Sequence, residues 1–375
     1  MKYLILFFSL CCSLFLGACS SEGIVDEPDG PKNPNDKAPS DTIEFMVLAY
    51  VDKASVEGHL GGSERVVRKK MEKLFQDVSA YWNKAGKGRL NAYYKYILGD
   101  MKIYDCGSND PDLTEVVYRG PMDYSKYGVA VLFDGLQDRE DDRGPGGAAG
   151  GGADNRCVIT VIARKDEPKD LFSEQTRNTL THELGHYREV TDVYQYIIAA
   201  KNNPVNGVAY NAPDCIMNWA AAGVWSEYAI NCINAVGDAI RVAIKYPNIF
   251  DSWYPKKLEI NVKKGDEPVR ADIKLYPSRA GGSNHDRDIY PEPLVSGRSG
   301  ADGKWMLTDM LGYFRVDKTK HPEIKVPADL PYGRCFGFLI EITYNRQSKY
   351  VWMSEIDAQM VTFEGKDTYN VDVSF

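Results

Sequence analysis

The segment from Thr181 to Asp192 reads T-H-E-L-G-H-Y-R-E-V-T-D, and it constrains this chain more than any other stretch. Residues four apart on a helix project from the same face, one turn above the other, so His182 and His186 can reach a single ion. Imidazole is a preferred ligand of zinc. Glu183 can take a proton from water and return it to a leaving amine. The spacing therefore predicts a zinc-binding helix with the chemistry of a peptidase.

The residues around this motif predict that it lies on a helix. Leu180 and Leu184 provide apolar positions for packing, and Ser173 can cap the helix N-terminus. The run from Phe172 to Val190 contains no proline and one internal glycine. Two of the five histidines of the chain lie in the motif. These features favour a zinc site over a chance occurrence of the string.

A catalytic zinc takes three protein ligands and leaves a position for water. Asp192 lies six residues after His186, and the later segment Asp214 to Trp219 reads D-C-I-M-N-W. Together they resemble the metzincin peptidases, whose motif H-E-x-x-H-x-x-G-x-x-H has an aspartate-ending variant and is followed by a methionine-containing turn. The resemblance implies that the two histidines and Asp192 hold the zinc, that Glu183 is the general base, and that Met217 forms the hydrophobic floor.

The third ligand has alternatives in the sequence, because Glu189 stands where the family has a glycine. That glycine lets the helix stop and the chain turn back toward the ion. If the helix continued instead, at about 100° per residue, Asp192 would rotate away from the histidine face. Glu189 lies near that face, and Glu227 lies on a later predicted helix. Both are alternative third ligands.

The N-terminus is typical of an exported lipoprotein. Residues 1–18 contain an apolar run, Tyr3 to Leu16, that is too short to span a membrane comfortably, and they end in L-G-A before Cys19. This resembles a bacterial lipobox and implies a signal peptide and a lipid on Cys19. Residues 19–41 are rich in Asp, Pro, Gly and Asn and are predicted to be a flexible acidic tether. Their acidic start resembles the export signal of Bacteroidetes lipoproteins, which implies an outer-membrane lipoprotein at the cell surface. The alternative is an outer-membrane lipoprotein that faces the periplasm.

The length of the chain bounds its number of domains, and its net charge bears on which partners it can bind. A chain of 375 residues is long enough for two domains with separate cores. It has 45 basic and 53 acidic residues and no basic tract, so a nucleic-acid partner is not expected. We expect instead a protein or peptide substrate.

Residues 42–254 are predicted to form an α+β catalytic domain with a mixed sheet. Expected strands are 42–51, 90–98, 128–133 and 157–163, and expected helices are 63–85, the zinc helix and a closing helix at 224–246. This order, which is that of a metzincin, lays the zinc helix across one face of the sheet.

Two stretches inside this domain allow more than one interpretation. The glycine-rich run 144–153 either lets a substrate backbone approach an edge strand closely or forms a flexible loop. The acidic residues Asp138, Glu140, Asp141 and Asp142 could ligate Ca²⁺, although a solvated charge run is the commoner case.

Residues 255–375 change to short alternating segments separated by Gly, Pro and Asn turns. Expected strands include 258–262, 271–276, 335–344 and 369–375, a pattern typical of a β-sandwich of immunoglobulin-like or transthyretin-like type. Such a domain could bind glycan or protein, but buttressing the catalytic half or acting as a spacer is the commoner case, and we expect one of these two roles.

An exported protein can form disulfides. The expected pairs are Cys106 with Cys157 and Cys215 with Cys232, and Cys335 is expected to be a buried free thiol.

The leading hypothesis is a zinc-dependent endopeptidase that hydrolyses extracellular proteins. The alternative is a catalytically inactive adhesin or binding protein on a metzincin scaffold. The presence of Glu183, the expected general base, disfavours this alternative. A third hypothesis is hydrolysis of a non-peptide amide by the same zinc chemistry.

Overall fold

The computed structural model describes residues 41–58, 60–104, 112–134, 146–151, 155–162, 171–279, 287–327, 330 and 333–375. The predicted signal peptide, nearly all of the tether and the acidic residues 138–142 lie outside these ranges. The described residues are mixed α and β with several sheets, as expected of an α+β protein. In these parts of the chain, no helix has the length and apolar character needed to cross a membrane.

The chain divides into two compact units. Residues 41–191 and Asp214–Pro247 form the first unit, and Asp192–Pro213 and Asn248–Phe375 form the second, which we call the C-terminal unit. The predicted cut near residue 254 therefore differs from the observed division, because the segment Asp192–Pro213 groups with the C-terminal residues. The reason is packing: Ile198 lies in one buried cluster with residues of the C-terminal strands, namely Tyr276, Ile289 and Leu339.

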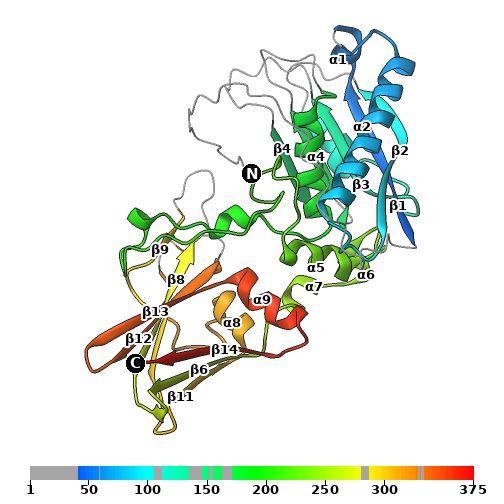
Figure 1. The fold of residues 1–375 in the computed structure, drawn as a ribbon. Helices are drawn as coiled ribbons and strands as arrows, with labels where there is room; N and C mark the ends of the chain where they lie inside the picture. The colour runs from blue at the N-terminus through cyan, green and yellow to red at the C-terminus, as the bar shows by residue number, and fades with distance from the viewer. Residues whose placement is uncertain are drawn as a thin grey trace, which may run out of the picture. The chain divides into compact units, whose positions relative to one another are not determined.

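A five-stranded sheet organises the first unit (Figure 1). Its strands are β1 Thr42–Asp52, β2 Tyr93–Tyr104, β3 Tyr127–Asp134, β4 Gly146–Gly151 and β5 Cys157–Ile162. The order is β2-β1-β3-β5-β4, and the pairs are parallel except for β4, which runs antiparallel to β5. The glycine-rich run 144–153, expected either to let a substrate backbone approach an edge strand or to form a flexible loop, contains the outer strand β4.

Two helices, α2 (Glu64–Ala85) and α4 (Glu174–Tyr187), cover the same face of this sheet (Figure 1). The predicted backing helix thus forms, and its Ser63 cap accepts a hydrogen bond from the backbone N–H of Val66. Its apolar stripe is fully buried and meets aromatic side chains of the strands: Trp82 packs edge-on against Tyr96 with ring centroids 5.2 Å apart. Burial of these rings sets α2 and α4 on the sheet.

Helix α3 (Asp112–Arg119) contributes to the core of the first unit through a different set of strand residues. Alternate residues of a strand point to opposite faces. Leu48 and Tyr50 of β1 share a buried cluster with Val117 of α3. By contrast, Phe45 of β1 packs edge-on against Tyr187 at the end of α4. The sheet is therefore buried on both faces, as the apolar composition of β1 indicates.

The predicted closing helix 224–246 is wrong in extent. The structure has α5 (Glu227–Val236) and a short α6 (Val242–Lys245), separated by Gly237 at φ +50°. The break has a tertiary cause: the buried guanidinium of Arg188 donates hydrogen bonds to the carbonyls of Gly237 and Ala239, at 3.0 and 2.6 Å. These carbonyls bind Arg188 and do not continue the helix.

The described residues of the C-terminal unit form two sheets. One has the order β11-β6-β14 with β7 beside β6, and comprises Lys304–Thr308, Lys257–Lys264, Thr368–Ser374 and Glu267–Pro268. The other has the order β10-β8-β12-β13 with β9 beside β8, and comprises Val295–Arg298, Asp272–Arg279, Gly337–Tyr344, Gln347–Ser354 and Asp288–Ile289. Side chains of both sheets, such as Ile260 and Ile340, belong to one hydrophobic cluster. Helices α8 (Met310–Phe314) and α9 (Glu355–Phe363) join this unit.

The expected disulfides are absent from the described residues. Cys157, Cys215, Cys232 and Cys335 are all free thiols, and Cys106 lies outside the described ranges. The predicted pair Cys215–Cys232 is therefore wrong, whereas Cys335 is buried and free as predicted. Cys215 serves another purpose, because its Sγ accepts a hydrogen bond from the backbone N–H of Ser226 at the start of α5.

Candidate metal centre

Helix α4 presents the two histidines of the motif. Ser173 caps it by accepting a hydrogen bond from the N–H of Thr176 at 3.1 Å. Leu180 and Leu184 are fully buried, which fixes the rotation of the helix. The sequence features that predicted this helix are those that form it.

Helix α4 ends at Tyr187, just before the segment that leads to Asp192. Glu189 has a φ of +62°, in the left-handed region that glycine usually occupies. The N–H of Glu189 donates to the carbonyl of His186, and the N–H of Val190 donates to the carbonyl of Gly185, both at 3.0 Å. This pair of hydrogen bonds is a Schellman motif. Glutamate here takes the conformation of the expected glycine, so the helix does not continue toward Asp192.

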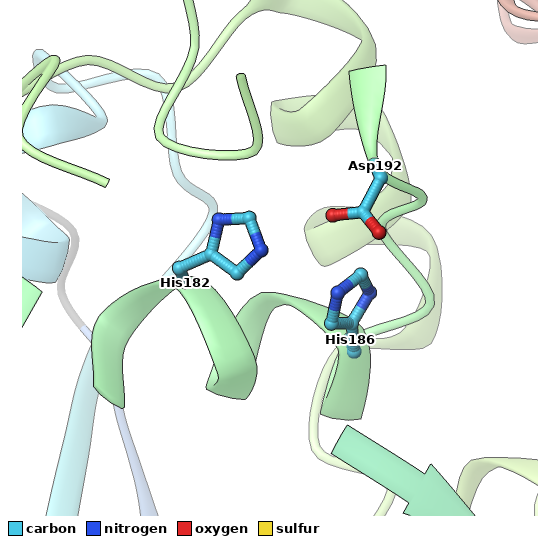
Figure 2. A group of neighbouring side chains, drawn as sticks. All are labelled: His182, His186 and Asp192. Atoms are coloured by element: carbon cyan, nitrogen blue, oxygen red, sulfur yellow. The ribbon is translucent and has the colours of Figure 1, made fainter. Parts of the chain in front are cut away.

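The turn after Glu189 brings Asp192 to the two histidines. The candidate ligand atoms of His182, His186 and Asp192 all lie within 4.8 Å of one another, and Figure 2 shows both rings and the carboxylate converging. At a tetrahedral zinc with bonds of about 2.1 Å, ligand atoms are about 3.4 Å apart. A modest closure of this group would therefore suit the ion, and two imidazoles with one carboxylate are a donor set that zinc accepts.

Backbone carbonyls fix the chemical form of both imidazoles. The Nδ1 atom of His182 lies 2.8 Å from the carbonyl oxygen of Ile216, and that of His186 lies 2.9 Å from the carbonyl oxygen of Val190. A carbonyl oxygen can only accept, so each Nδ1 carries a proton and each Nε2 of the neutral ring has a lone pair. Metal-binding histidines are held in this way in proteins. The sequence motif did not reveal these two acceptors.

The carboxylate of Asp192 is also held. The hydroxyl of Tyr194 donates to Oδ2 of Asp192 at 2.6 Å, and the side-chain amide of Gln195 approaches the same atom at 3.4 Å. Both residues lie in η3, the 3-10 turn Val193–Tyr196 that directly follows. We did not predict the role of Tyr194 from the sequence. The signal that could have indicated it is a tyrosine hydroxyl two residues after the proposed ligand Asp192.

The two alternative ligands do not belong to this group. Glu227 is in the first turn of α5, its side chain is 65% exposed, and Arg89 lies 3.3 Å from its carboxylate. Glu189 ends the helix in the left-handed conformation, and burial raises the pKa of its carboxyl above the usual value. Among the described residues, the structure brings Asp192 to the histidines and leaves both glutamates out.

The methionine-containing turn lies directly against helix α4. The N–H groups of Asn218 and Trp219 donate to the carbonyl of Cys215 at 2.8 and 3.0 Å, which closes a tight turn around the fully buried Met217. A Cβ atom added to Gly185 would lie 2.5 Å from the sulfur of Met217. Glycine between the two histidines therefore allows this close approach.

Glu183 lies beside the edge strand β4. Its side chain is buried. A Cβ atom added to Gly147 of β4 would lie 2.8 Å from Oε1 of Glu183 and 2.7 Å from Cγ2 of Thr179. The glycine of β4 therefore leaves the space that the Glu183 carboxylate occupies.

Comparisons with known proteins give limited similarity. No protein-family model matches the chain, and a search of curated proteins finds no match. A chain in the structure of a chaperone-substrate complex is 14% identical with a TM-score of 0.30, and the match covers 54% of this chain and 39% of that one. A 9R-lipoxygenase from Cyanothece PCC8801 is 12% identical with a TM-score of 0.16, covering 32% and 16%. TM-scores this low establish no shared fold.

Proposed function

We propose that this chain is a zinc-dependent endopeptidase in which His182, His186 and Asp192 hold the metal. The observation that carries the proposal is the state of the imidazoles. Both rings donate Nδ1–H to a backbone carbonyl, so in each neutral ring Nε2 is the atom whose lone pair can bind an ion near the Asp192 carboxylate. A chance H-E-x-x-H string on a surface helix would have no reason to meet two carbonyl acceptors and a third ligand.

Glu183 is the proposed general base. A zinc ion at this site would acidify water and polarise the scissile carbonyl. Glu183 then accepts a proton from the attacking water and delivers it to the nitrogen of the leaving amine. Its burial beside β4 keeps bulk water away from the carboxylate, which strengthens its interaction with the charges that develop during the reaction.

A peptide in extended conformation is the substrate that β4 suits. Strand β4 is the outer strand of its sheet in the described residues, and it consists only of glycine and alanine. Its backbone can therefore pair with an added strand at close range. Gly147 lies on this strand and against Glu183, so a peptide paired there would pass close to the general base.

The fold supports the same proposal. We infer a metzincin-like catalytic domain from the mixed sheet with an antiparallel outer strand, the zinc helix across its face and the methionine turn beneath it. We also infer that the C-terminal unit is a β-sandwich, because its two sheets share one core.

The test uses the full-length chain and two glutamate variants of the same helix. Glu183→Gln should keep stoichiometric zinc uptake and lose casein cleavage by about 100-fold or more, because the general base is gone and the ligands remain. Glu174→Gln, in the exposed first turn of α4, is the matched control and should cleave as the parent does.

Other outcomes distinguish the alternatives. Stoichiometric zinc without cleavage of casein or of a mixed peptide library would favour the inactive adhesin, and cleavage of small amides alone would favour the non-peptide amidase. Cleavage that is insensitive to chelator and to Glu183→Gln would contradict the zinc mechanism.

The chain is further proposed to be an outer-membrane lipoprotein facing the cell surface. The support is the sequence L-G-A before Cys19 and the acidic stretch after it. Mass spectrometry of the mature N-terminus tests this, and Cys19→Ser should release the chain from membranes.

A further inference from the structure

The turn that follows Asp192 is tied to a residue far along the chain. Asp192 is the N-cap residue of η3, and Tyr196 is its last residue. The hydroxyl of Tyr196 donates to Oε2 of Glu355 at 2.7 Å, across 159 positions of sequence. Tyr196 is 2% exposed and Glu355 is completely buried. The end of the turn is therefore anchored at the start of helix α9, inside the C-terminal unit.

Glu355 is a rigid anchor because other groups hold it in place. Its carboxylate also accepts hydrogen bonds from the hydroxyl of Tyr254 and, at 2.5 Å, from the guanidinium of Arg334. A buried carboxylate needs a cation and donors to replace its lost hydration, and Arg334 with the two tyrosines provides both. The side chain that receives Tyr196 thus has little freedom to move.

A second anchor acts on the middle of the same turn. The guanidinium of Arg287, next to strand β9, donates to the backbone carbonyl of Tyr194 at 2.6 Å, and it lies 5.8 Å from the centre of the Tyr194 ring. The hydroxyl of Tyr194 in turn donates to Asp192 at 2.6 Å. Arg287 therefore fixes the residue that orients the carboxylate.

We propose that Glu355 and Arg287 are positioning residues for the metal ligand Asp192. Glu355 acts through Tyr196 and Arg287 acts through Tyr194, so η3 is clamped at both of its tyrosines. The inference rests on the proposed zinc site and deepens it. It gives the residues that hold η3 a part in orienting Asp192. Outer-shell partners of metal ligands typically contribute 10- to 100-fold to metal affinity.

The experiment measures zinc affinity in the full-length chain by competition with a chelator, together with the visible absorption spectrum of the cobalt-loaded chain. Tyr194→Phe removes the hydroxyl that holds Asp192 and should weaken zinc by about 10- to 100-fold. Tyr196→Phe removes only the link to Glu355 and should weaken zinc by about tenfold, with a changed cobalt spectrum, because the carboxylate is no longer fixed.

Tyr313→Phe is the matched control. It removes a hydroxyl that donates to another carboxylate of the C-terminal unit, that of Glu323, at 2.7 Å, and it leaves Glu355 and its three partners in place. It should keep the parental zinc affinity and cobalt spectrum.

Two results would overturn the inference while leaving the proposed function standing. One is a Tyr196→Phe variant that binds zinc and cobalt like the parent. The other is equal weakening in Tyr196→Phe and Tyr313→Phe, since that would trace the loss to general packing of the C-terminal unit and not to the link between Glu355 and the turn. A parental chain that takes up no zinc would instead refute the proposed function, and this inference with it.

Discussion

Gly185 and Met217 are in direct contact: a Cβ atom on Gly185 would lie 2.5 Å from the methionine sulfur. The contact joins helix α4 to the turn in which the carbonyl of Ile216, the residue before Met217, holds the ring of His182. The packing of helix α4 and the orientation of the His182 ring therefore depend on the same two segments.

Gly185→Ala should destabilise the chain. The methyl group overpacks the contact with Met217 by about 3 kcal/mol, against a gain of about 1 kcal/mol in helix propensity, so the net loss is about 2 kcal/mol in the free energy of unfolding. Urea unfolding measures this. In the double variant with Met217→Ala the two losses should not add, because the clash is gone. Full additivity would show that the contact is not formed.

Glu189→Gly should stabilise the chain by about 1 kcal/mol. A residue with a Cβ atom is strained at a φ of +62°, and glycine is not. The control is Glu189→Ala, which removes the same carboxylate but keeps the Cβ atom. The difference between the two variants in urea or thermal unfolding isolates the backbone term. If alanine is as stable as glycine, the helix does not end in the left-handed conformation.

Arg188→Lys should cost about 2 kcal/mol of unfolding free energy. The guanidinium donates to the carbonyls of Gly237 and Ala239 and lies 4.5 Å from the ring centre of Phe45 and 4.2 Å from that of Tyr187. Lysine cannot form this fork or stack on both rings, and it leaves a buried carbonyl without a donor. Arg177→Lys, on the partly exposed surface of α4, is the comparison and should cost less than 1 kcal/mol. Equal losses would contradict this role of Arg188.

Reducing agent should leave the unfolding midpoint of the chain unchanged, because Cys215 and Cys232 are free. Burial raises the pKa of both thiols above the usual value, so the reactive thiolate is scarce at pH 8. Alkylation of the native chain at these positions should be slow from pH 7 to pH 8, and unfolding in urea should make it fast. Mass spectrometry of peptides alkylated before and after unfolding follows both thiols. A Cys215–Cys232 disulfide in the native chain would contradict the prediction.

Local patterns predicted much of the framework of the site. The apolar period and the serine caps placed helices α2 and α4, because both signals act within a few residues of the chain. The spacing of His182 and His186 put them on one face for the same reason. The cluster with Asp192 could be named from the sequence only as one of three alternatives.

Other features depend on partners that are distant in the sequence. The helix ends at Glu189 although no glycine is present, because the Schellman hydrogen bonds and the buried Arg188 beside it hold that conformation. The break of the closing helix at Gly237 also depends on Arg188, whose guanidinium donates hydrogen bonds to the carbonyls of Gly237 and Ala239. A residue-type signal cannot report a conformation that tertiary contacts impose.

The sequence by itself determined which side chains could bind a metal ion and activate water. These are an imidazole pair one helical turn apart and a neighbouring carboxylate, with a methionine in a later turn. Only the tertiary structure decided how those side chains are held. The acceptors of the two imidazoles and the anchors of Asp192 are Ile216, Val190, Arg287 and Glu355. Helical periodicity follows from backbone geometry within one segment, whereas hydrogen bonds between segments exist only after packing has excluded water and brought their partners together.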